Sequence, residues 1–155
     1  MGWSTSPDDA YLMLRGLRTL PTRLAQHERN ALALAEWLKG QPNVVEVICP
    51  GLPGSRGHEL WKRDFTGQNG LIGLVLSPAS DAAVEAFLNA LDLFGLGFSW
   101  GGFESLAISC DAQFGQRKYP PSFSGPLIRL HVGLENVDDL KIDLARALSV
   151  YASPR

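Results

Sequence analysis

Segments with two different hydrophobic periods alternate along this chain, and the alternation restricts the fold more than any other sequence feature. Apolar positions recur every three or four residues within 24–38, on one helical face made of Leu24, His27, Ala31, Leu34 and Leu38. Residues 44–49, 71–76 and 127–132 are instead short, apolar and mostly β-branched or aliphatic, which predicts strands. Helices and strands in one chain indicate an α+β or α/β domain.

Further helices are expected where a capping residue precedes a helical pattern. Ser6, Ser80 or Asp81, and Asn136 are the expected starts, and a short helix is expected at 58–65. The first helix should kink or restart at Leu20-Pro21, because proline removes a backbone hydrogen bond. Short strands are expected at 94–98 and 106–109, and residues 113–124 should be irregular and exposed. The order predicts an α+β fold, with a small, mostly antiparallel sheet, helices on one face and a long kinked helical arm in front.

Charge and composition exclude several classes of protein. The net charge is −2 and both signs are spread along the chain, so no basic face for nucleic acid is expected. No apolar run approaches the roughly 20 residues of a membrane-spanning helix. Two isolated cysteines, Cys49 and Cys110, indicate a reducing compartment rather than a disulfide scaffold. The first residues do not have the pattern of a secretory signal, so a cytoplasmic location is expected.

Common catalytic motifs are absent from the sequence. The histidines and cysteines lack the short spacings of a metal site, and residues 95–100 break the glycine pattern of a phosphate loop. The acid pairs at 8–9 and 138–139 are explained by helix starts. His27 lies on an apolar helical face, so we expect a core or interface histidine.

Two segments suggest a binding site. Residues 98–106 place Ser99 and Trp100 beside two glycines, which let a backbone approach a ligand closely. From these residues alone, a turn with a core tryptophan is the favoured explanation. In residues 127–135, Arg129 interrupts an apolar strand, and its guanidinium needs an anion or solvent. Arginine matches a carboxylate through two parallel hydrogen bonds. From the residues alone, an internal ion pair, with Glu104 for example, and a ligand carboxylate are equally good explanations.

These segments together resemble the C-terminal domain of the fold-type I pyridoxal-phosphate (PLP) enzymes of cysteine and methionine metabolism. The similarity covers essentially the whole chain and is carried by five ordered segments: 6–21, with Asp-Ala-Tyr-Leu-Met-Leu-Arg-Gly-Leu-Arg-Thr-Leu in it; 27–31, His-Glu-Arg-Asn-Ala; 50–52, Pro-Gly-Leu; 99–106, Ser-Trp-Gly-Gly-Phe-Glu-Ser-Leu; and 128–135, Ile-Arg-Leu-His-Val-Gly-Leu-Glu. The resemblance implies an interdomain helical arm at 1–40 and a substrate-side α+β domain at 41–155, without the catalytic PLP-binding domain.

The subgroup is suggested by Trp100 and by residues 58–67, which resemble the bacterial cystathionine β-lyases. The resemblance implies cleavage of cystathionine to homocysteine, pyruvate and ammonia in methionine biosynthesis. Other transsulfuration enzymes, a γ-lyase or a γ-synthase, are the nearest alternatives. A non-catalytic module that binds an amino acid or a partner is the alternative outside enzymology. Departures at Cys110, Lys141 and 113–119 leave the substrate range open.

Site residues follow from the resemblance one by one. Arg129 matches the arginine that binds the substrate α-carboxylate, and Ser99 and Trp100 match the loop that completes this pocket. The family needs a lysine that forms a Schiff base with PLP, in a Ser-x-Thr-Lys context. The four lysines, Lys39, Lys62, Lys118 and Lys141, all lack this context. We therefore expect a fragment that is inactive alone and does not bind PLP covalently, with no metal site.

The partners expected from the resemblance are an amino-acid substrate, the protein's own N-terminal catalytic domain and further copies of the same chain in a homo-oligomer. Neither nucleic acid nor a membrane is expected as a partner.

Overall fold

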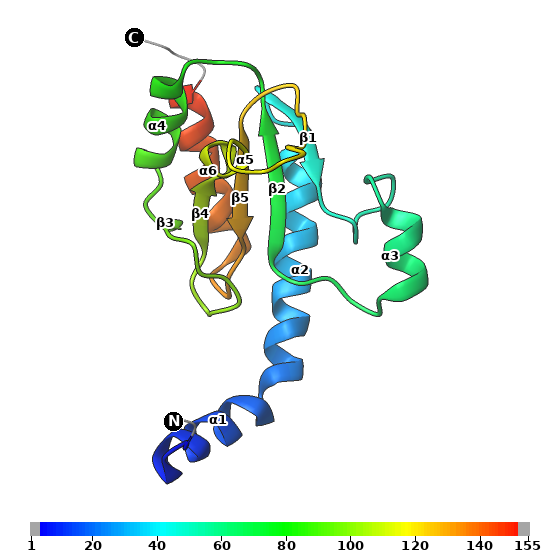
Figure 1. Cartoon of the computed structure of the whole chain (residues 1–155), viewed down its shortest axis with the longest axis vertical. Coiled ribbons are helices and arrows are strands. Elements are labelled where there is room, and N and C mark those ends of the chain that lie inside the picture. Colours follow the sequence, from blue (N-terminus) through cyan, green and yellow to red (C-terminus); the bar gives the residue numbers. More distant parts are fainter. Residues whose placement is uncertain (1–3, 152–155) are drawn as a thin grey trace.

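One five-stranded sheet organises the chain in the computed structural model, which describes residues 4–151 (Figure 1). Its order is β1-β2-β5-β4-β3, and all neighbours are antiparallel except β3 and β4. The strands are β1 (Val44–Ile48), β2 (Leu71–Leu76), β3 (Gly95–Leu96), β4 (Leu106–Ser109) and β5 (Leu127–His131). The predicted α+β class with a mostly antiparallel sheet is confirmed.

Three long helices cover one face of this sheet. The helices are α1 (Pro7–Arg18), α2 (Leu20–Leu38), α3 (His58–Asp64), α4 (Asp81–Asn89), α5 (Asp111–Phe114) and α6 (Val137–Tyr151). Helices α2, α4 and α6 form the covering layer, whereas α3 lies beyond the β1 edge (Figure 1). The other face of the sheet is left for the loops, which is where the candidate site lies.

The helix starts confirm the capping predictions. The side chains of Ser6, Ser80 and Asn136 each accept a backbone N–H two or three residues further on, at 2.8–3.4 Å. The acid pairs at 8–9 and 138–139 lie in first turns, where they complement the helix dipole. Local sequence therefore determines these boundaries.

Strand alternation separates the core from the open face. On β5, Ile128 and Leu130 are fully buried among the helices. Arg129, between them, faces the opposite side because successive side chains of a strand point to opposite faces. The apolar side chains on the helix-covered face each gain roughly 1.5–3 kcal/mol from burial, which fixes the register.

The helical arm ends where the residues of α2 begin to be buried in the core. Helix α1 has no buried residue, and α2 restarts at Leu20 with Pro21 in its first turn, as predicted. His27, Ala31, Leu34 and Leu38 are buried, but Leu24, predicted on the same face, is 46% exposed. Leu24 is exposed because α2 extends past the sheet before the core begins (Figure 1).

Two segments differ from the sequence expectation. The strand predicted at 94–98 is limited to Gly95–Leu96, since Phe94 turns into the core and Phe98 is 71% exposed in a loop. Residues 111–114 form the short helix α5. This helix includes residues 113 and 114, the first two of the segment that was predicted to be irregular. Most of 115–124 has no regular structure and is exposed, as predicted.

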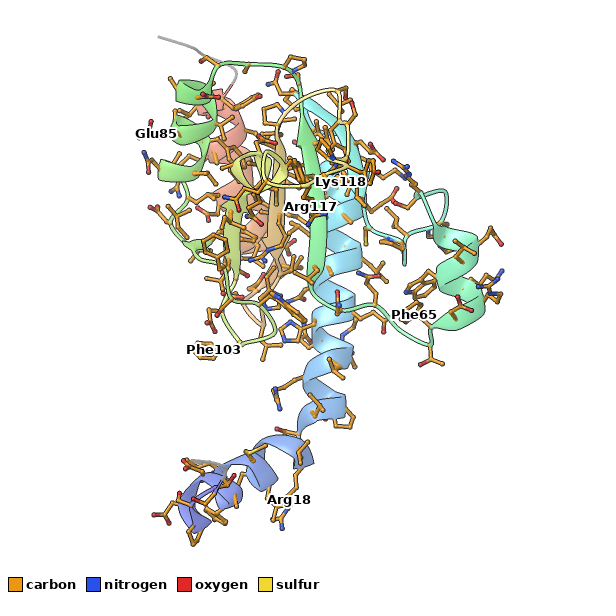
Figure 2. All side chains as sticks on the ribbon, viewed as in Figure 1. Arg18, Phe65, Glu85, Phe103, Arg117 and Lys118 are labelled. Atoms are coloured by element: carbon orange, nitrogen blue, oxygen red, sulfur yellow. The ribbon has the colours of Figure 1, made fainter. Side chains whose placement is uncertain are left out.

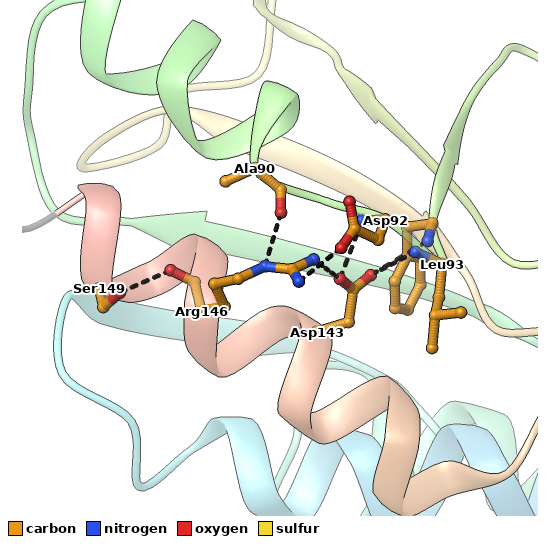
Figure 3. Close-up of polar contacts among 7 residues, drawn as sticks. Ala90, Asp92, Leu93, Asp143, Arg146 and Ser149 are labelled. Atoms are coloured by element: carbon orange, nitrogen blue, oxygen red, sulfur yellow. Dashed lines mark hydrogen bonds and ion pairs between the residues drawn. The ribbon is translucent and has the colours of Figure 1, made fainter.

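A buried carboxylate ties α6 to the chain that follows α4 (Figure 3). Asp143, which is 3% exposed, accepts the backbone N–H groups of Asp92, Leu93 and Phe94 at 2.9–3.2 Å. Arg146, one turn further along α6, pairs with Asp143 and Asp92. The turn that leads into β3 is therefore fixed by one side chain.

None of the helices within residues 4–151 is both long enough and apolar enough to cross a membrane.

Candidate functional site

Arg129 lies at the middle of the open face of the sheet. It is on β5, opposite Gly73 of β2 on one side and Ile108 of β4 on the other. Beside it runs the loop of residues 97–105, which joins the short β3 to β4. The two segments selected from the sequence therefore meet in space.

The guanidinium of Arg129 holds the start of this loop. Its Nη2 donates to the carbonyl oxygens of Gly97, Phe98 and Ser99 at 3.1, 2.8 and 3.1 Å. Its Nε is buried and has no hydrogen-bond partner. Within residues 4–151, all hydrogen bonds of the guanidinium come from Nη2. One nitrogen thus supports the loop, and the Nε edge has hydrogen-bonding capacity left.

The charge of Arg129 is not neutralised by the part of the chain that the structure describes. The five ion pairs found there involve other side chains, and Glu104 is not a partner of Arg129. The alternative of an internal ion pair with Glu104 is therefore wrong. A half-buried guanidinium with a free N–H and no counter-charge is suited to binding an anion, above all a planar carboxylate.

Ser99 and Trp100 lie beside this charge. Ser99 contributes its carbonyl oxygen to Arg129, and the Trp100 side chain is 59% exposed on the same loop. Phe103, at the outer end of the loop, points away from the sheet and is 75% exposed (Figure 2). The loop therefore directs backbone oxygens at the arginine, and its Trp100 and Phe103 side chains are exposed.

Two histidines lie beneath the middle of the loop. His131 Nε2 is 3.1 Å from both Gly101 N and Gly102 O, and its ring centroid is 5.3 Å from that of His27. Burial lowers the pKa of His131, and the neighbouring His27 adds to this, whereas the Gly102 carbonyl opposes it. His27 is 4% exposed and its Nδ1 lies 2.8 Å from Val132 O, so the prediction of a core histidine is confirmed.

The residues that hold the far end of the loop were not predicted from the sequence. Ser105 donates to the carboxylate of Glu135 from both its backbone N–H and its hydroxyl, at 2.7 and 2.9 Å. The available signal was that Glu135 closely follows the strand of Arg129 and His131, which lie on the same side of β5.

Among the described residues, no group of three or more His, Cys, Asp or Glu side chains could hold a metal ion. Cys49 and Cys110 are free thiols, and burial raises the pKa of Cys49 to about 11, so it is unreactive near neutral pH.

Comparison with known proteins identifies the family to which the chain belongs. Residues 1–149 match the model of the family described as Cys/Met metabolism PLP-dependent enzyme. The chain is 48% identical to the cystathionine β-lyase of Bordetella avium over 96% of its own length and 37% of that protein. It is 42% identical to the cystathionine γ-lyase of Bos taurus, over 99% of its length and 39% of that protein.

A solved structure has the same fold. It is the crystal structure of cystathionine γ-synthase from Xanthomonas oryzae pv. oryzae in complex with cystathionine, at a TM-score of 0.84 and 38% identity. The match covers 96% of this chain and 40% of that one. The chain thus spans about two fifths of the length of the proteins it matches.

The residues present do not fit covalent attachment of PLP. A lysine that bonds to the cofactor must lose its proton, which requires burial or a neighbouring cation. Lys39 and Lys141 instead contact Glu36 and Asp138, and Lys62 and Lys118 are exposed. We therefore derive no catalytic step through the cofactor from this chain. What its residues can do is bind and orient an anionic group at Arg129.

Proposed function

The chain belongs to the Cys/Met metabolism PLP-dependent enzyme family, and from this premise we propose that it is the substrate-binding part of a carbon–sulfur β-lyase. The proposed substrate is cystathionine, and the products are homocysteine, pyruvate and ammonia. The β-elimination is supported by the 48% identity to the cystathionine β-lyase of Bordetella avium. In this proposal PLP is held by the catalytic domain of the parent enzyme.

The observation that carries the proposal is the unneutralised guanidinium of Arg129. Its buried Nε has no partner, while Nη2 is already held by three loop carbonyls. A substrate α-carboxylate would supply both the missing acceptor and the missing negative charge. Fixing the carboxylate fixes the orientation of the amino acid, which lowers the barrier of any step at its Cα. In the same proposal Ser99 and Trp100 complete the pocket around this carboxylate.

The test is reconstitution with the missing part of the enzyme. The chain is co-expressed with the N-terminal part of the Bordetella avium enzyme, and pyruvate release from cystathionine is measured. Arg129→Ala should lower kcat/KM by about 100-fold or more, because substrate orientation is lost. Arg63→Ala is the matched control, since Arg63 contacts only Asp64 on exposed α3. Equal activity of Arg129→Ala and the unchanged assembly would refute the role of Arg129.

A γ-cleaving or γ-replacing enzyme is the second candidate, because the bovine γ-lyase and the Xanthomonas γ-synthase are also similar. The keto acid released from cystathionine separates the two reactions. Pyruvate supports β-elimination, and 2-oxobutyrate supports γ-elimination. An assembly that releases neither keto acid, although it forms, would favour a non-catalytic binding module.

The partner surfaces are also a proposal. Helix α1 exposes Tyr11, Leu12, Met13, Leu14 and Leu17, each at least 48% accessible. Apolar side chains gathered on one exposed helix favour association. We propose that α1 packs against the catalytic domain of the parent enzyme and that the enzyme is a cytoplasmic homo-oligomer. Size measurement of the reconstituted assembly tests the oligomer.

A further inference from the structure

Strand β5 and the chain that follows it contact the 97–105 loop through a row of residues. Arg129 holds the carbonyls at 97–99, and His131 Nε2 lies 3.1 Å from Gly101 N and Gly102 O. Gly133 and Glu135 both contact Ser105, and Leu134 N donates to Phe103 O at 2.8 Å. The two ends of this row are a cation and a carboxylate.

The carboxylate end is the most completely satisfied polar cluster of the loop. Ser105, which is 1% exposed, donates its N–H to Glu135 Oε1 and its hydroxyl to Oε2. The same hydroxyl accepts the N–H of Gly133 at 2.8 Å. Asn30 of α2 donates to the carbonyls of Gly133 and Glu135, both at 3.0 Å. Hydrogen bonds to a carboxylate are the strong kind, so Glu135 holds Ser105 firmly.

Without the contact between Glu135 and Ser105, few contacts hold the start of the 97–105 loop beside Arg129. The loop leaves β3, which consists of two residues, and its start is held by one backbone hydrogen bond from Gly97 N to Ala107 O at 3.3 Å and by the Nη2 contacts of Arg129. If Ser105 is released, the carbonyls at 97–99 can shift, and Arg129 can then adopt another rotamer. A shift of about 1 Å in a positioning group can cost about 100-fold in rate.

We infer that Glu135 is a positioning residue for Arg129: through Ser105 it fixes the loop so that the carbonyls at 97–99 hold Nη2 and leave Nε free for a substrate carboxylate. This inference rests on the proposed function of Arg129. Glu135 does not touch the substrate in this scheme.

The experiment uses the reconstituted enzyme with Glu135→Ala, Glu135→Gln and Ser105→Ala. We expect Glu135→Ala to raise KM for cystathionine about 10- to 100-fold while kcat changes less, because carboxylate binding is weakened before and during the reaction alike. Glu135→Gln keeps one acceptor for the Ser105 N–H and should recover part of the loss. Ser105→Ala keeps the N–H contact and should cause a smaller rise in KM.

A matched control separates positioning from folding. Glu28 accepts the backbone N–H of Gln68 at 3.0 Å, so its carboxylate has a similar structural role in another loop. Glu28→Ala should leave KM unchanged, because a structural defect reduces the amount of active enzyme and not the affinity of what remains. An unchanged KM in Glu135→Ala, or an equal rise in Glu28→Ala, overturns the inference.

Hydrogen exchange on the chain itself gives a second readout. We expect faster exchange of the amides at 101–105 in Glu135→Ala, with unchanged exchange in the buried strand β2. Unchanged exchange at 101–105 would also overturn the inference. Full activity of Arg129→Ala would refute the proposed function and this inference together, whereas inactive Arg129→Ala with normal Glu135→Ala would refute this inference alone.

Discussion

At Gly133, an added methyl group would meet the backbone of the 97–105 loop. A Cβ there would lie 2.3 Å from the Phe103 carbonyl oxygen and 2.4 Å from Glu135 Oε2, closer than real contacts allow. We predict that Gly133→Ala lowers the free energy of unfolding by about 2–3 kcal/mol, because the loop must shift. Urea unfolding measures this. Gly115→Ala, with open space at its Cβ, is the control and should change stability by less than about 0.5 kcal/mol.

The pH dependence of stability should report His131. Because burial lowers its pKa in the folded chain, the unfolded chain binds the proton more readily. The stabilising contribution is therefore present above the unfolded pKa of about 6.5 and is lost as pH falls toward the folded pKa. We predict a decrease of up to about 1.4 kcal/mol per pH unit below pH 6.5, measured by urea unfolding.

The control for this prediction is the slope of a variant. His131→Gln should reduce the pH dependence below about pH 6.5, whatever its effect on absolute stability. An identical slope in His131→Gln and in the unchanged chain would contradict the assignment to His131.

Some side chains link one element to another through hydrogen bonds that the helical pattern does not predict. Asp143 lies on α6 among the buried residues and takes three N–H groups from the turn after α4 (Figure 3). We predict that Asp143→Ala lowers the free energy of unfolding by about 2–4 kcal/mol, because buried N–H groups lose their acceptor. Chemical denaturation should show a lower midpoint with an unchanged slope.

The contrast is Asp92, which contacts the same Arg146 but is exposed. Asp92→Ala should cost less than about 1 kcal/mol, as is usual for surface ion pairs. Similar losses in both variants would show that burial of the carboxylate is not what makes Asp143 important.

At the scale of the whole molecule, the arm and the body differ in what holds them. Helix α1 has no buried side chain, whereas α2 enters the core from His27 onward. We predict that deleting residues 1–18 shifts the thermal midpoint by less than about 2 °C, since α1 contributes no buried side chain. Deleting residues 1–32 should prevent folding, because His27, Asn30 and Ala31 are removed. Circular dichroism against temperature measures both.

Local sequence predicted most of the elements. The caps at Ser6, Ser80 and Asn136 and the break at Leu20-Pro21 depend on residues within one turn, so a reader of the sequence can find them. The strand predicted at 94–98 was too long, and the exposure of Leu24 could not be foreseen, because how far the sheet and the helix extend depends on distant residues. Periodicity tells which face is apolar, but it does not tell where the partner surface ends.

For the candidate site, the sequence by itself determined that Arg129 interrupts an apolar strand and that Ser99 and Trp100 lie beside glycines. Only the tertiary structure decided what surrounds the charge. Pairing β4 with β5 brings residues 30 positions apart into contact, placing loop carbonyls on Arg129 and Ser105 on Glu135. The choice between an internal ion pair and a free guanidinium depends on such long-range contacts, because sheet pairing and not chain proximity sets the neighbours of a strand residue.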